Sequence, residues 1–181
     1  MNGKQLKNSI LQWAIQGKLV PQDPNDEPAS VLLERIRAEK ARLVKEKKIK
    51  KDKNESIIYR GEDNSYYEKF LATREVKCID EEIPFEIPAT WEWCRLLSIV
   101  SLLGDGIHGT PEYSEGGSVY FINGNNLFDG QILIKPDTKT VSKEEAVKHS
   151  RLLNESTVLV SINGTIGNIA FYSGENVILE R

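Results

Sequence analysis

The sequence predicts a mixed α+β protein in which two helices precede a β-rich domain. Apolar residues recur at helical spacing before residue 50, whereas short β-branched and aromatic runs separated by Gly and Asn fill residues 91–181. The 181 residues are 39% hydrophobic and 28% charged, which is typical of a soluble globular protein. The length suits one core of ordinary size, or a small domain with a helical appendage.

The first helix is expected from about Lys4 to Gly17. Leu6, Ile10 and Trp13 share one helical face, and Gly17 provides a stop. The run PQDPNDEP, residues 21–28, excludes regular structure because its three prolines remove donors and fix φ.

A second helix is expected from Ala29 or Ser30 to about Lys50. Its helix-forming residues surround a thin apolar stripe made of Leu32, Leu33, Ile36, Leu43 and Val44. Two interpretations are open: a solvated surface helix, or one arm of an antiparallel helical pair.

Residues 51–90 mix charges with short apolar clusters, and we expect an ordered linker there. Residues 91–181 then form the β-rich domain, with a short amphipathic helix from Lys143 to Leu153. Strands are expected in the runs VYFI, QILIK, TVLVSI, NIAFY and NVILE.

The net charge of −3 hides a strong asymmetry along the chain. Glu34 to Lys53 holds ten Lys and Arg against four acids, a net charge of +6, whereas residues 54–90 carry −5 and residues 91–181 carry −4. Nucleic-acid binding would therefore depend on local patches and not on bulk charge.

Motifs for catalysis are missing from the sequence. Cys78 and Cys94 lack the spacing of a zinc site or a redox pair, and two histidines are too few for a convincing catalytic or metal constellation. No Gly-x-x-x-x-Gly-Lys phosphate loop and no Asn/Asp-Pro-Pro-Tyr/Phe run is present. We expect no enzyme activity and no metal site in this chain. The N-terminus does not look like a signal peptide and no run is long enough to cross a bilayer, so a cytoplasmic protein without membrane contact is expected.

Several long runs resemble the specificity (S) subunit of type I restriction-modification systems. They are ILQWAIQGKLVPQDPNDEPASVLLERIRAEKARL, IIYRGEDNSYYEK, IDEEIPFEIPATWEWCRL, DGIHGTPEY and VLVSINGTIGNIAFY. Together they cover nearly the whole chain.

The resemblance implies a non-catalytic subunit that gives a DNA-methylating and DNA-cleaving complex its sequence specificity. In that family two target recognition domains each read one half of a split double-stranded DNA site, and an antiparallel helical pair spaces them and docks the methylation (M) subunits. S-adenosylmethionine, ATP and Mg would belong to the M and restriction (R) subunits, with no cofactor in this chain.

By this resemblance residues 1–50 are a helical spacer and docking element, in which Leu32, Ile36 and Leu43 would contact the M subunit. Residues 91–181 are expected to be a target recognition domain that is incomplete at its C-terminal end, because such domains are normally longer. The chain would then be an N-terminal fragment or a truncated gene product.

The candidate DNA-binding residues fall into three groups. A glycine-rich loop, GDGIHGTPEY, offers Gly106, His108, Thr110 and Tyr113. Two Asn-Gly turns offer base-edge contacts from Asn123, Asn125, Asn163 and Thr165. Phosphate contacts are expected from Lys139, Lys143, Lys148 and Arg151.

Each group has a purely structural alternative. His108 would tie down its own loop, the Asn-Gly pairs would supply the positive φ of tight turns, and the lysines would form a solvated helix face. Two other functions are also open: a helical protein-interaction module that reads no DNA, and, far less favoured, a hydrolase using Cys94 or His108.

Overall fold

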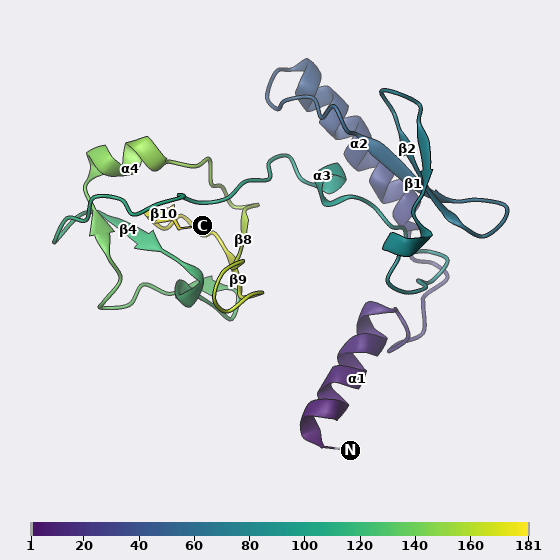
Figure 1. Ribbon diagram of the computed structural model, residues 1–181, viewed down its shortest axis with the longest axis horizontal. Coiled ribbons are helices and arrows are strands. Elements are labelled where there is room, and N and C mark those ends of the chain that lie inside the picture. Colours follow the sequence, from purple (N-terminus) through teal and green to yellow (C-terminus); the bar gives the residue numbers. More distant parts are fainter. Residues whose placement is uncertain (1, 181) are drawn as a thin grey trace. The chain divides into compact units, whose positions relative to one another are not determined.

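The computed structural model describes residues 2–180 and confirms the mixed α+β class (Figure 1). Two compact units divide between Leu103 and Gly104. Residues up to Leu103 are called the first unit below, and residues from Gly104 on the second unit. Among the described residues, every helix is too short or too polar to span a bilayer.

Helix α1, Gly3–Ile15, begins with a capping box in which the Asn2 side chain accepts from the backbone N–H of Gln5 and the Gln5 side chain accepts from that of Asn2. None of its residues is buried, and Trp13 is 56% exposed. Gly17 follows at φ +67°, where a Cβ would lie 2.5 Å from Cγ of Pro88. The turn after α1 therefore packs on the segment around Pro88, while the helix itself leaves its apolar face in solvent.

Helix α2, Ala29–Lys45, stops before the predicted end at Lys50. Lys47 adopts φ +59°, and the run KEKKIKK places like charges three and four positions apart, which disfavours further helix. The half-buried face of α2 packs against α3, Leu96–Ile99, and Lys40 Nζ donates to the carbonyl of Leu97.

The predicted linker, residues 51–90, contains a three-stranded antiparallel sheet. Its strands in spatial order are β1, Ser56–Arg60, β2, Tyr66–Phe70, and β3, Val76–Cys78. A short 3-10 helix, η1, Asp80–Glu82, follows. The first unit thus includes this sheet and extends beyond Trp91, where the sequence analysis placed a domain boundary.

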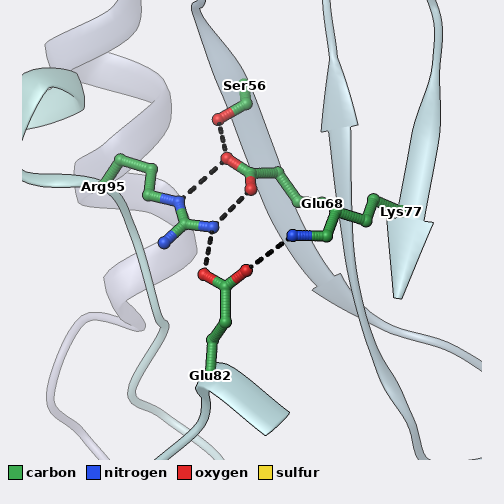
Figure 2. A network of polar contacts seen from close by, with 5 residues as sticks. All are labelled: Ser56, Glu68, Lys77, Glu82 and Arg95. Carbon is green, nitrogen blue, oxygen red and sulfur yellow. Dashed lines mark hydrogen bonds and ion pairs between the residues drawn. The ribbon is translucent and has the colours of Figure 1, made fainter. Parts of the chain in front are cut away.

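A buried carboxylate joins the separate pieces of the first unit (Figure 2). Glu68, 5% exposed in its side chain, accepts from Ser56 Oγ at 2.5 Å and from two nitrogens of Arg95. The Arg95 guanidinium also donates to Glu82 at 2.8 Å, and Lys77 pairs with the other oxygen of Glu82 at 2.9 Å. The bonds from Arg95, then that from Ser56, hold the pKa of Glu68 below its usual range although burial opposes this.

The second unit is organised around strand β4, Val119–Ile122. It pairs in parallel with β10, Val177–Leu179, and antiparallel with β7, Thr140–Val141. Helix α4, Lys143–His149, begins at an Ser142 cap and ends short of the predicted Leu153. Ala146 of α4 packs in the core made by the inward side chains of this sheet, Val119, Phe121, Val141 and Ile178.

A second core contains Ile122 of β4 together with residues of two small hairpins. One pairs β5, Leu127–Phe128, with β6, Gln131–Ile132; the other pairs β8, Val158–Val160, with β9, Ile169–Phe171. The inward residues are Ile122, Leu127, Ile132, Leu159 and Ala170. Strands lie in all five runs in which they were predicted.

We expect Glu68→Gln to lower the stability of the first unit by about 1.5–3 kcal/mol, the usual range for bonds to a charged group. Because the folded-state pKa of Glu68 is lowered, its contribution is complete above the ordinary carboxylate range and is lost as pH falls through the lowered pKa. Urea unfolding of both proteins should therefore show a difference at neutral pH that shrinks in acid.

Arg42→Ala is the matched control, because Arg42 also pairs with two glutamates, Glu39 and Glu46, but on the exposed surface of α2. Exposed ion pairs contribute little, so this variant should unfold almost like the parent. Equal losses in the two variants would show that burial of Glu68 adds nothing.

Candidate nucleic-acid interface

The glycine-rich loop, residues 104–113, begins against the end of β10. The N–H of Ile107 donates to the carbonyl of Leu179 at 2.7 Å, and Ile107 forms a parallel bridge with Glu180. Gly106 is buried here, and a Cβ on it would lie 2.3 Å from the carbonyl oxygen of Leu179. Glycine is required at 106 by this close backbone approach.

The other end of the loop is fixed against β7 and α4. Pro111 is buried, and the N–H of Glu112 donates to the Glu145 carboxylate at 3.2 Å. Tyr113 bridges to Val141 and leaves 46% of its surface exposed. Both ends of the loop are therefore held by the sheet and its covering helix.

Between these anchors the tip of the loop is exposed. His108 and Thr110 are both exposed, and His108 Nε2 lies 2.5 Å from Asp105 Oδ2. His108 thus makes the bond within its own loop that the structural alternative predicts, and it also presents most of its side chain to solvent.

The two Asn-Gly turns lie side by side. Asn168 Nδ2 donates to the carbonyl of Gly124 at 3.1 Å, and a Cβ on Gly124 would lie 2.8 Å from Cβ of Ser161. Asn125, Asn163 and Thr165 are exposed. Asn123 is half-buried, and its Oδ1 accepts from the N–H of Asn125 as the cap of η2, Gly124–Asn126.

The loop and the first Asn-Gly turn meet at one edge of the main sheet. Because β4 and β10 are parallel, with Leu179 opposite Ile122, their carboxyl ends lie together. Glu180 N–H donates to Ile122 just before the turn begins, and Glu180 also bridges to Ile107 of the loop. Residues predicted from separate stretches therefore converge on this edge, which we call the β4–β10 edge.

The four predicted phosphate-binding side chains are exposed, but two of them are already used within the second unit. Lys148 Nζ donates to Glu145 Oε2 at 2.6 Å, and Arg151 Nε donates to the carbonyl of Asp105 at 3.0 Å. Lys139 and Lys143 have no comparable bond among the contacts of the described residues.

Sequence reasoning missed Glu145, a buried residue of the first turn of α4. It receives donors from Lys148, from the backbone of Glu112 and from His149 at 3.1 Å. The Lys148 bond, followed by the Glu112 bond, lowers the pKa of Glu145 to about 2 against the effect of burial. The sequence offers only a weak signal, an acidic pair after a Ser cap, which does not say which Glu is buried.

The residues of the predicted docking stripe of α2 differ in their exposure. Leu32 is 45% exposed, whereas Ile36 and Leu43 are half-buried on the face turned toward the rest of the first unit. Leu33 and Arg37 line a small pocket with β1 and Cys94. Helix α1 presents a larger exposed apolar surface, made of Leu6, Ile10, Leu11, Trp13 and Ile15.

Nothing in the geometry favours the hydrolase alternative. Burial raises the pKa of the Cys94 thiol, which disfavours the nucleophilic thiolate. No group of three or more His, Cys, Asp or Glu within residues 2–180 is arranged to hold a metal ion.

Comparisons with known proteins connect most of the chain to one family. It is 39% identical over 163 residues to the type I restriction enzyme EcoAI specificity subunit of Escherichia coli, covering 90% of this chain and 24% of that protein. It is 34% identical over 161 residues to the EcoEI specificity subunit of the same organism, covering 88% of this chain and 24% of that protein. No protein-family model and no solved structure matched. The resemblance identified in the sequence is thus confirmed: the chain is related to the specificity subunits of type I restriction enzymes and spans about a quarter of the length of these two relatives.

Proposed function

We propose that this chain is a non-catalytic DNA-recognition component of a type I restriction enzyme. Its second unit reads one half of a split double-stranded target with the β4–β10 edge, and its N-terminal helices dock the methylation subunit. The observation that carries the DNA-reading role is the convergence of an anchored loop with an exposed tip and an Asn-Gly turn on one sheet edge.

The chemistry at this edge suits recognition of bases better than bulk attraction to DNA. His108, Thr110 and Asn125 are exposed polar side chains that can donate and accept hydrogen bonds. Acidic groups lie nearby in Asp105 and Glu112, and Lys148 is paired with Glu145. Affinity for phosphates would therefore come largely from the assembled complex, while the edge contributes selectivity.

The docking role is supported by the exposed apolar face of α1 and by Leu32 of α2. Isolated amphipathic helices are marginal in water, so a helix with no buried residue gains stability when a partner covers it. The same exposure, together with the net charge of −4 on residues 91–181, favours the second candidate: a protein-interaction module that reads no DNA.

The complex is purified through the tagged chain, expressed with its genomic neighbours, and its target is the DNA site that it methylates. In this complex His108→Ala and Thr110→Ala should each lower discrimination between the target duplex and a scrambled duplex by about 1–3 kcal/mol. Lys139→Ala and Lys143→Ala should instead weaken both duplexes equally and reduce the salt slope by about one each, since phosphate contacts carry no base information. Binding over a salt series measures both effects.

The two lysines serve as the comparison for the loop variants because they are exposed and hold no loop backbone. If His108→Ala and Thr110→Ala both leave discrimination intact, the loop is a structural turn and the interaction-module candidate gains.

Gly106→Ala should also reduce discrimination, because the added methyl group meets the carbonyl of Leu179 and forces the loop away from β10. Gly104→Ala is the matched control, since a Cβ there meets nothing within 4 Å. Target and scrambled-duplex affinities of the two variants measure the effect. Equal discrimination by the two variants would contradict a requirement for the close approach of Gly106 to Leu179.

Leu32→Asp should weaken capture of the methylation subunit by the tagged chain, because a charge in an apolar interface is costly. Leu32 is preferable to Ile36 or Leu43, whose half-burial in the first unit would confuse docking with folding. Leu152→Asp, at a leucine that is 85% exposed in the second unit, is the control. If Leu32→Asp captures the methylation subunit as well as the parent does, this part of α2 is not a docking surface.

A further inference from the structure

We propose that Glu145 and Arg151 are positioning residues that clamp the two ends of the recognition loop and thereby set its specificity. This inference rests on the proposed DNA-reading function of the same loop. Neither side chain needs to touch DNA in order to act.

The two contacts grip opposite ends of one segment. Arg151 Nε donates to the carbonyl of Asp105, where the loop begins, and Glu145 Oε1 accepts from the N–H of Glu112, where it ends. The two clamp residues are six positions apart, in α4 and just after it, whereas the loop residues they hold are 46 and 33 positions away in sequence. One short stretch of chain, residues 145–151, therefore fixes both ends.

Helix α4, which carries Glu145, is itself anchored in the core of the second unit. Ala146 is buried among the side chains of β4, β7 and β10, and Ser142 caps the helix by accepting from the N–H of Glu145. The third anchor, Ile107 on Leu179, fixes the loop to the same sheet. Holding a recognition tip from a rigid scaffold reduces the ordering cost on binding and sharpens discrimination between similar targets.

The charge of Glu145 is compensated locally. Lys148 lies 2.6 Å from Oε2 and His149 3.1 Å from Oε1, so the buried carboxylate can remain ionised while it accepts the Glu112 bond. This gives Lys148 a role in holding the clamp that differs from the phosphate contact expected from the sequence.

The contact that Arg151 makes with the loop depends on its guanidinium geometry as well as on its charge. Its Nε contacts a backbone carbonyl, and lysine has no donor at the corresponding position along the side chain. A charge-conserving Arg151→Lys substitution therefore separates positioning from phosphate attraction.

The test uses the assembled complex and four variants. Glu145→Gln and Arg151→Lys should each reduce the ratio of target to scrambled-duplex affinity at least about fivefold. Arg151→Lys should leave scrambled-duplex affinity and salt slope unchanged, and Glu145→Gln should change them no more than Glu144→Gln does. Glu144→Gln makes the same charge change one position away on an exposed residue and should keep the ratio. His108→Ala reports whether the loop reads DNA at all.

Amide hydrogen exchange on the same complex gives a readout independent of DNA. Peptides covering residues 105–112 should exchange faster in Glu145→Gln and Arg151→Lys, while peptides of β4 and β10 keep their protection. A merely global loss of stability would raise exchange in both regions and would overturn the inference.

The two levels of proposal fail differently. If His108→Ala loses discrimination while Glu145→Gln and Arg151→Lys keep it, the clamp is overturned and the loop remains the reader. If His108→Ala and the clamp variants all keep discrimination, the proposed function of the loop falls, and the clamp with it. Unchanged exchange of residues 105–112 in the clamp variants also overturns the clamp, whatever the DNA result.

Discussion

The hydrogen-bonded pair of Glu68 and Arg95 is the interaction on which the first unit depends. The apolar core there is thin, since only Tyr66 and Ile79 are buried hydrophobic side chains among its described residues. The pair connects β2 to the segment that leads into α3, and through Ser56 and Glu82 it also reaches β1 and η1 (Figure 2). Burying a carboxylate costs solvation, so the arrangement is favourable only because several donors satisfy it at once. It therefore fixes which segments meet and in which geometry.

The second unit uses the same device for a different purpose. Glu145 is likewise a buried glutamate that receives donors from several directions, but one donor is the backbone of the glycine-rich loop. Here two apolar cores already hold the strands together. The buried charge is consequently available to hold the Glu112 end of a loop that also packs Ile107 against the first core and buries Pro111. In both units a buried glutamate adds a polar contact that apolar packing alone does not provide.

The sequence was a good guide wherever burial follows hydropathy. The helix starts, the strand runs after residue 118 and the Asn-Gly turns all follow from spacing and turn chemistry. The sheet in residues 56–78 was missed because its most buried positions include Ser56 and Glu68, which reverses the usual pattern. Long-range contacts such as Gly106 on Leu179 also leave no local signal, since any small residue in a loop reads as flexibility. The sequence left the apolar stripe of α2 open between a solvated surface helix and one arm of a helical pair, because it cannot tell a partner from another part of the same chain.

The distribution of charge along the chain suggests that different parts of it would contribute affinity for DNA and selectivity for its sequence. The net positive charge lies between Glu34 and Lys53, in the first unit, whereas the proposed reading edge belongs to residues that are net negative. A segment with a net negative charge attracts DNA phosphates weakly as a whole, so binding at the wrong sequence gains little from bulk attraction there. Selectivity would then depend on contacts to base edges, which require a well-placed loop. The physical demand on the loop is therefore precision of position, and that is the property that anchoring by Ile107, Glu145 and Arg151 supplies.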